Sequence, residues 1–357
     1  MTDRVYLDWN ATAPLRPEAR QAMIAAMELV GNPSSVHAEG RAAKSLVELS
    51  RARVAEAVGC KPSEIVFTSG ATEAAAVLAQ AHGIGDVYVQ DTAHDCLWAH
   101  AQMHGQTPET GNTLAMGLAN SETGVITPPP ARHDGLFSYG ARRADWLLLD
   151  VVQAIGRVPF AFSWSGADLA IVSAHKLGGP KGVGALIVRE GLDIGALSLG
   201  GGQEMGRRSG TENVVGIAGF GAAAQAAARD LADGVWDRVA TRRDMLEATI
   251  VADAPGTVCV GADAERLPNT TCLIAHGWKG ETQVMAMDLA GFAVSAGSAC
   301  SSGKVRTSRV LQATGFDDVA SASAIRVSLG PETTEHDVMR FADTWLAAHK
   351  KYRARAA

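Results

Sequence analysis

The sequence lacks the cysteine spacings, the basic excess and the long apolar runs that mark several large classes of protein. Its five cysteines form no CxxC pair and no zinc-type spacing, so neither a disulfide framework nor a metal site is predicted. The net charge of −6 at pH 7 gives no indication of nucleic acid as a partner. No apolar run is long enough to span a bilayer, so no membrane partner is predicted.

The N-terminus also lacks the charged and apolar regions of a signal peptide. We therefore expect a soluble protein in a reducing, cytoplasmic setting. Aromatic residues are few, at 5%, whereas 47% of the residues are hydrophobic and 38 are glycine. This composition favours close packing of helices on a sheet, and a chain of 357 residues predicts a large core divided between two domains.

A glycine-rich segment, residues 173–182, lies between two short apolar runs, Asp168–Val172 and Val183–Val188. We interpret both runs as buried parallel strands. Lys176 would then follow the carboxyl end of a strand, where open α/β sheets place their ligands. A lysine flanked by His175 and small residues loses its proton more easily than a solvated lysine. The segment alone is compatible with a Schiff-base lysine or with an ordinary surface lysine.

A second glycine-containing turn, residues 69–73, joins a predicted strand, Glu64–Thr68, to a predicted helix, Ala74–Ala81. The N-terminus of a helix offers unpaired backbone N–H groups and partial positive charge to an anion. The turn is therefore either a phosphate seat or an ordinary turn in which Thr72 caps the helix.

Polar side chains also follow two other predicted strands. His94 comes after Val87–Val89, and Asp150 lies near the end of the strongly apolar run Trp146–Gln153. Burying a carboxylate is costly without a partner. Asp150 should therefore meet an arginine, a helix N-terminus or the protonated ring nitrogen of a cofactor.

One cysteine differs from the others in its surroundings. Residues 296–304 are almost all small, so we expect Cys300 to be exposed on a mobile loop, near the basic Lys304 and Arg306. Such a thiol is either a reactive nucleophile or an incidental loop residue. Cys96, two residues past His94, is a weaker rival nucleophile.

Together these motifs resemble the cysteine desulfurases, which are pyridoxal-phosphate enzymes of the class-V aminotransferase family, and within them the NifS/IscS-like branch. The resemblance runs from Tyr6 to Gly330 and includes residues 31–35, 68–73, 173–176, 208–211 and 298–300. It implies an α/β fold, the fold-type I pyridoxal-phosphate-dependent transferase. A large domain, residues 14–232, would hold a mostly parallel seven-stranded sheet between helices. Residues 1–13 and 233–357 would form a smaller α+β domain that carries the cysteine loop.

The resemblance also implies the site residues. Three would be catalytic: Lys176 carries the cofactor as a Schiff base and then moves protons, Cys300 attacks the substrate sulfur, and His94 stacks on the cofactor ring. Arg326 and Asn32 would bind the carboxylate of L-cysteine. The residues implied to hold pyridoxal 5'-phosphate are His94, Lys176, Ala71, Thr72, Ser173 and His175, with Thr211 from the neighbouring subunit of a homodimer, Asp150 at the ring nitrogen, and Gln153, Asn120 and Ser121 towards the ring hydroxyl.

The implied reaction gives L-alanine and a persulfide on Cys300, for iron–sulfur cluster assembly or another sulfur acceptor. Three features depart from the family pattern. Ser121 replaces an asparagine, the stretch between Trp98 and Thr113 is short, and the C-terminus ends soon after the last predicted helix. Longer members of the family use a C-terminal tail to dock an iron–sulfur scaffold protein. The resemblance therefore does not decide whether this protein delivers sulfur to such a scaffold.

Three alternatives remain from the sequence: a selenocysteine lyase, another class-V enzyme such as an aminotransferase, and a catalytically silent relative that acts as a binding partner. Cys300 argues against an aminotransferase, which needs no thiol.

Overall fold

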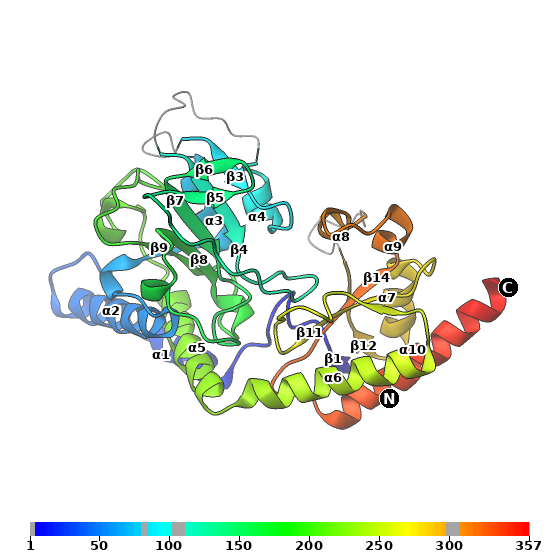
Figure 1. Ribbon diagram of the computed structural model, residues 1–357. Helices are drawn as coiled ribbons and strands as arrows, with labels where there is room; N and C mark the ends of the chain where they lie inside the picture. The colour runs from blue at the N-terminus through cyan, green and yellow to red at the C-terminus, as the bar shows by residue number, and fades with distance from the viewer. Residues whose placement is uncertain (1–3, 80–84, 102–110, 298–306, 357) are drawn as a thin grey trace. The chain divides into compact units, whose positions relative to one another are not determined.

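The computed structural model describes residues 4–79, 85–101, 111–297 and 307–356 (Figure 1). The chain divides into two compact units. The larger unit comprises Pro14–Leu118 and Thr127–Ala232. The smaller unit comprises Met1–Ala13, Ala119–Ile126 and Asp233–Ala357.

The larger unit is built on a sheet of six strands among the described residues. Five strands point the same way, and β9 alone is antiparallel to both of its neighbours. The prediction of a mostly parallel central sheet is thus confirmed, whereas the prediction that Val183–Val188 is a parallel strand is wrong. In spatial order the strands are β2 (Ile65–Thr68), β9 (Gly184–Val188), β8 (Leu169–Ser173), β7 (Trp146–Asp150), β4 (Thr113–Gly117) and β3 (Val87–Val89).

The described residues contribute six strands to this sheet, against the seven that were predicted. Between β3 and β4 only part of the chain is described. The described residues of that stretch form a four-residue helix, α4 (Asp95–Trp98), and no strand. A small separate hairpin, β5 (Phe137–Tyr139) with β6 (Arg142–Ala144), completes the strands of this unit.

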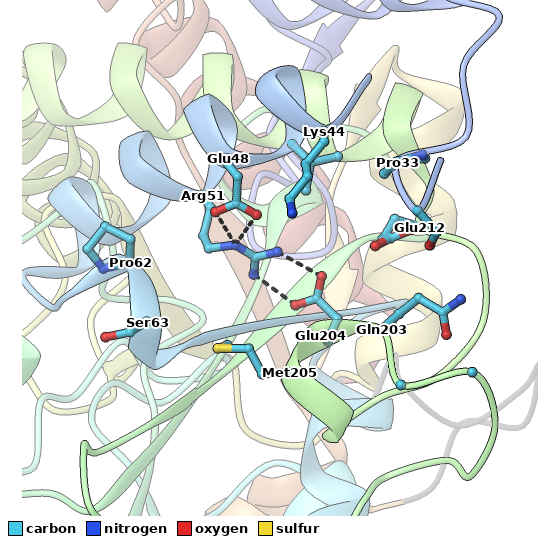
Figure 2. A pocket seen from close by; sticks show the side chains of 14 residues that line it. Pro33, Lys44, Glu48, Arg51, Pro62, Ser63, Gln203, Glu204, Met205 and Glu212 are labelled. Atoms are coloured by element: carbon cyan, nitrogen blue, oxygen red, sulfur yellow. Dashed lines mark hydrogen bonds and ion pairs between the residues drawn. The ribbon is translucent and has the colours of Figure 1, made fainter. Parts of the chain in front are cut away.

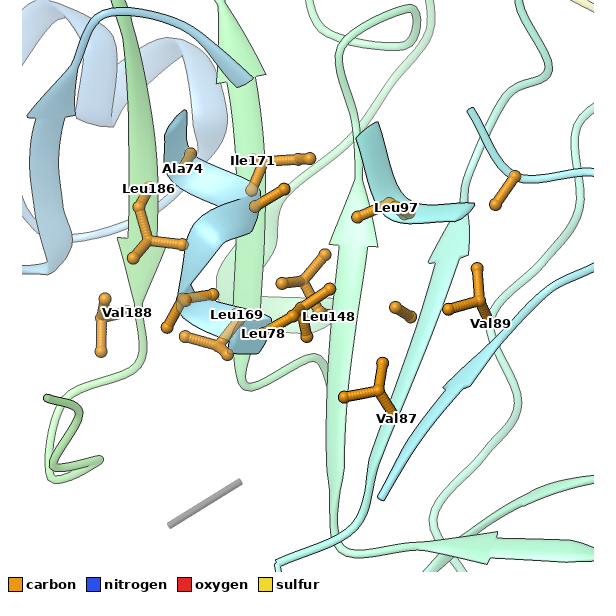
Figure 3. Close-up of a cluster of buried hydrophobic side chains, with 14 of the residues drawn as sticks. Ala74, Leu78, Val87, Val89, Leu97, Leu148, Leu169, Ile171, Leu186 and Val188 are labelled. Carbon is orange, nitrogen blue, oxygen red and sulfur yellow. The ribbon is translucent and has the colours of Figure 1, made fainter. Parts of the chain in front are cut away.

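Helices cover both faces of the sheet. On one face, α3 (Ala71–Ala75), the 3₁₀ turn η2 (Ala76–Ala79) and α4 enclose a cluster of buried aliphatic side chains (Figure 3). On the other face, the ring of Phe220 in α5 (Val214–Ala232) contacts that of Phe67 edge to face, with centroids 6.2 Å apart. Successive side chains of a strand point to opposite faces. Val66 therefore packs into the cluster on the first face, and Phe67 packs against Phe220 on the other. Helices α1 (Pro17–Met27) and α2 (Ala38–Val58) pack beside α5 (Figure 1).

Glycine is required where β9 passes the turn after β2. A Cβ atom on Gly184 would lie 2.5 Å from the carbonyl oxygen of Val172 and 2.7 Å from the Cα of Gly70. Gly70 itself has a φ of +157°, at the limit of what other residues adopt. These two glycines bring the start of α3 close to the end of β8.

The smaller unit is an α+β domain. Its four-stranded antiparallel sheet has the order β10 (Val258–Cys259), β11 (Thr270–Ile274), β14 (Ala324–Ser328) and β13 (Ser295–Ala296). A parallel pair, β1 (Val5–Tyr6) with β12 (Phe292–Ala293), brings the N-terminus into this unit. Its described helices are α6 (Val235–Asp253), α7 (Gly280–Leu289), α8 (Arg309–Ala313), α9 (Asp318–Ala322) and α10 (Glu335–Ala356).

The segment Ala119–Ile126, predicted to belong to the large domain, lies in the smaller unit. Backbone hydrogen bonds explain the difference. The Ile126 N–H donates to the carbonyl of Glu265, and the Leu267 N–H donates to the carbonyl of Gly124, both at 2.8 Å. Hydrogen bonds between distant parts of the chain are not visible in local sequence patterns.

Among the residues with described positions, none of the helices is both long and apolar enough to cross a bilayer.

The cluster in Figure 3 generates a stability prediction. Leu148 in β7 is fully buried within it, so Leu148→Ala should lower the free energy of unfolding by about 2–5 kcal/mol through lost burial and a residual cavity. Leu49 on α2 is 50% exposed, so Leu49→Ala should cost less than about 1 kcal/mol. Urea unfolding of both variants measures the difference. Equal losses would show that the cluster does not stabilise this unit.

Candidate active site

The predicted cofactor residues of the larger unit follow the carboxyl ends of strands that point the same way. Asp150 ends β7, and Ser173 ends β8 just before the turn η4 (Ala174–Lys176). His94 follows β3, and the turn to Ala71 follows β2. Parallel strands present these ends at one edge of the sheet, so the structure brings these residues to the same edge.

The Asp150 carboxyl is buried at this edge. Its Oδ1 accepts a hydrogen bond from the Val152 backbone N–H at 2.9 Å. Burial raises the pKa of Asp150, while the charges of His94 and Lys176 and the Val152 hydrogen bond act in the opposite direction. The carboxyl therefore lies within the electrostatic reach of His94 and Lys176, two of the three predicted catalytic residues.

His94 is held in place by the helix that it begins. Its Nδ1 accepts a hydrogen bond from the Cys96 backbone N–H at 3.1 Å, which caps the N-terminus of α4. Ligand-type atoms of His94, Cys96 and Asp150 all lie within 4.8 Å of one another. Cys96 is thus a neighbour of the predicted cofactor residues.

Burial raises the pKa of the Cys96 thiol, although the hydrogen bond with His94 opposes this effect. Cys60, Cys259 and Cys272, the other cysteines among the described residues, also have thiol pKa values raised by burial. A thiol with a raised pKa supplies little thiolate at neutral pH. Burial thus disfavours the thiolate form of these four cysteines, and Cys300 lies outside the described residues.

Sequence reasoning missed Arg157, which organises the Lys176 turn. This buried guanidinium donates to the Gln153 side chain through Nη1 and to the Lys176 carbonyl oxygen through Nη2, the latter at 2.9 Å. It therefore fixes the backbone of Lys176 relative to Gln153. The only available sequence signal was an arginine four residues after Gln153, which is not specific.

His175 is half-buried beside two lysines. Burial, with the positive charges of Lys176 and Lys181, lowers the pKa of His175 to about 4. The imidazole is therefore neutral at physiological pH, and it offers an anion one N–H donor without a net charge.

The loop that precedes Thr211 is anchored by a buried ion pair (Figure 2). Arg51 of α2 donates to both carboxylate oxygens of Glu204, at 2.8 and 2.9 Å. Beside this pair lies a cavity of about 490 Å³, into which Lys44 and Glu212 also project. None of its lining residues is a predicted site residue, so this cavity is not the predicted active site.

Thr211 and Asn32 are both exposed in the larger unit. The Asn32 side chain accepts a hydrogen bond from the Ser34 N–H at 2.9 Å, so it stabilises its own turn. Nothing in the larger unit by itself assigns either residue to a ligand.

In the smaller unit, Arg326 is buried. Its Nη2 donates to Asp8 at 2.7 Å and its Nη1 donates to the Ser121 carbonyl oxygen at 3.1 Å. Its buried Nε has no hydrogen-bond partner among the described residues. Asn120 uses its side-chain oxygen to accept the N–H groups of Glu122 and Thr123. Asn120 and Ser121 are thus part of the framework around Arg326.

Comparisons with known proteins agree with this geometry. The model of the aminotransferase class-V family matches residues 5–106 and 102–341. The chain belongs to the class-V aminotransferase family. It is 37% identical to a cysteine desulfurase of Cereibacter sphaeroides, over 95% of this chain and 94% of that protein. It is 33% identical to the cysteine desulfurase IscS of Dictyoglomus turgidum, over 95% and 92% of the two chains.

A solved structure of a NifS-like protein from Rickettsia africae superposes with a TM-score of 0.85, at 27% identity and over 97% of this chain and 99% of that one. The predicted family and fold-type I fold are therefore confirmed. The family consists of pyridoxal-phosphate-dependent enzymes, so the predictions of an enzyme and of this cofactor are confirmed as well.

The donor set in the larger unit fits pyridoxal 5'-phosphate. A buried carboxylate at Asp150 suits a protonated ring nitrogen, and Lys176 lies close enough to influence the pKa of that carboxyl. A Cβ atom on Gly70 would meet only the Ser173 Oγ, at 3.9 Å, so the backbone is open where a phosphate would approach the start of α3.

The His175 environment generates a pH prediction for the cofactor-free protein. Because the folded-state pKa is lowered from 6.5 to about 4, the unfolded chain binds a proton first as the pH falls. The contribution of His175 to stability is therefore complete above about pH 6.5 and is lost as the pH falls towards 4. His175→Gln should flatten this part of the stability profile, measured by urea unfolding at pH 7.5, 6 and 5. A profile that keeps the wild-type slope would contradict the assignment.

Proposed function

We propose that this protein is a cysteine desulfurase, which removes sulfur from L-cysteine, releases L-alanine and leaves the sulfur on Cys300. The observation that carries the proposal is the meeting of Asp150, His94 and Lys176 at one sheet edge in a chain of this family. The names of the relatives at 33% and 37% identity support the same substrate.

Each residue of the larger unit would have a distinct task. Pyridoxal phosphate, when bound, supplies an electron sink. Asp150 would keep the ring nitrogen protonated, and His94 would hold the ring by stacking. The Lys176 amine would carry protons to and from the substrate carbon, while Arg157 holds its backbone still. Ala71, Thr72, Ser173 and His175 would bind the phosphate.

In the smaller unit, Arg326 would bind the substrate carboxylate, since its buried Nε still lacks an acceptor among the described residues. The Cys300 thiolate would attack the substrate sulfur, so that an S–S bond forms as the Cβ–S bond breaks. The electron pair of the broken bond stays with the carbon fragment, which takes up a proton and becomes alanine.

The protein would act as a homodimer in which Thr211 reaches the phosphate of the neighbouring subunit. Its persulfide would pass to a sulfur acceptor, such as an iron–sulfur scaffold protein. A cytoplasmic location stays a prediction from the sequence.

The first test of this function is an assay for sulfide and alanine from L-cysteine, run with Lys176→Ala. Loss of the cofactor anchor and of the proton carrier should lower turnover roughly 10³-fold or more. Lys181→Ala is the matched control, because Lys181 lies in the same glycine-rich turn but is exposed. Near-normal alanine release by the Lys176 variant would refute the role of Lys176. If the wild-type protein used only L-selenocysteine, the proposed substrate would be wrong.

A second test compares the two candidate thiols. Cys300→Ser should still bind cofactor and L-cysteine but should form no protein-bound persulfide, because a hydroxyl is almost wholly protonated at neutral pH. Cys96→Ser should keep persulfide formation, since burial raises the pKa of the Cys96 thiol. Mass spectrometry after one turnover measures the persulfide. The opposite pattern would move the nucleophile to Cys96.

A further inference from the structure

Two parts of the larger unit that would bind phosphate are joined by an ion pair. The Glu73 carboxylate accepts the Ser69 N–H through Oε2 at 2.6 Å and the Arg208 Nε–H through Oε1 at 3.0 Å. Burial opposes ionisation of Glu73, but the hydrogen bonds from Ser69 and Arg208 outweigh it and lower the pKa of the carboxyl. Glu73 is therefore charged at neutral pH, and its carboxylate binds both the turn at Ser69 and the loop at Arg208.

The same two parts are joined a second time at Glu204. Its Oε2 accepts the Phe67 backbone N–H at 2.8 Å, and Arg51 binds both of its oxygens. The Glu204 side chain is 2% exposed, so this contact is shielded from water. Glu204 and Met205 both have positive φ angles, +48° and +57°, which are strained for residues other than glycine. The ion pair thus holds the loop in a conformation that it would not adopt alone.

The loop 204–211 is consequently tied at residues 204 and 208 to the segment 67–73. That segment contains Ala71 and Thr72, which under the proposed function bind the phosphate of their own subunit. The loop ends at Thr211, which under the same proposal binds the phosphate of the neighbouring subunit. Any shift of the turn on phosphate binding is passed to the loop through two short, charged contacts.

We propose that the Glu73–Arg208 ion pair couples the two cofactor sites of the dimer. This inference rests on the proposed function, because it needs both the cofactor and the exchange of Thr211 between subunits. A cofactor bound in one subunit fixes the turn 69–72, and Arg208 then holds the following residues in position for the other subunit. Glu73 and Arg208 act as positioning residues, and the expected coupling is positive.

The charges of the pair make the two substitutions unequal. Arg208→Gln leaves the Glu73 carboxylate without its cation, one residue from a phosphate seat. Glu73→Gln removes that negative charge and keeps an acceptor for the Ser69 N–H. The Arg208 and Glu73 side chains are only 25% and 27% exposed, so removing one of them leaves a largely buried charge unpaired and costs more than removing both. Arg208→Gln should therefore weaken cofactor binding more than Glu73→Gln, and the double variant should recover part of the loss.

The experiment is a titration of cofactor-free dimer with pyridoxal 5'-phosphate, read by visible absorbance. Wild-type protein should give a Hill coefficient above 1. Arg208→Gln should weaken binding about tenfold and bring the Hill coefficient to 1. Glu73→Gln should also bring the coefficient to 1 with a smaller loss of affinity. Arg208→Lys, which keeps the charge, should restore part of the coupling.

Arg229→Gln is the matched control, because Arg229 also pairs with a glutamate, Glu18, at 3.2 Å in the same unit but away from the loop. It should titrate like the wild type. Thermal melting of each cofactor-free variant separates a folding defect from a coupling defect. Wild-type coupling and affinity in both single variants would overturn the inference and leave the proposed function intact, whereas a wild-type protein that binds no cofactor would overturn both.

Discussion

A carboxylate buried at the end of a central strand is the constraint on which the rest of the active-site edge depends. Asp150 loses water because β7 runs through the middle of the sheet, and this burial raises its pKa. An ionised carboxylate is stable there only if cations and donors surround it. His94, Lys176 and the Val152 N–H supply them, and each occupies a position that the strand order dictates. The site therefore lies where the buried apolar strands end and polar side chains begin.

Much of this edge could be predicted from the sequence, because its signals are local. Apolar runs that end near a polar residue predicted the strands before Asp150 and Lys176 to within a few residues. The motifs around Lys176 and Thr72 then led to the family. Glycine-rich turns were the most informative positions for assigning the family, because few other residues adopt their backbone conformations.

What could not be predicted depends on contacts between distant residues. Arg157 and Glu204 have no local signature, since their partners lie elsewhere in the chain. Arg208 belongs to a family motif, but its partner Glu73 is far away in the sequence. The assignment of Ala119–Ile126 to the smaller unit rests on hydrogen bonds to residues 265 and 267. The direction of β9 was also hidden, because an apolar run has the same composition whichever way it points.

Under the proposed function, an unused hydrogen-bonding group on Arg326 would define which molecules the site accepts. Its Nη atoms donate to Asp8 and to the Ser121 carbonyl, while the buried Nε has no acceptor in the part of the chain that the structure describes. With Arg326 as the carboxylate-binding residue, an α-amino acid would complete this donor, whereas a decarboxylated amine such as cysteamine would leave it unpaired in a dry environment. A protein discriminates most strongly against an analogue that lacks the carboxylate when that analogue leaves a buried donor of the protein without a hydrogen bond. The framework of Asp8 and Ser121 would thus act as a filter against the simple thiol amines of metabolism.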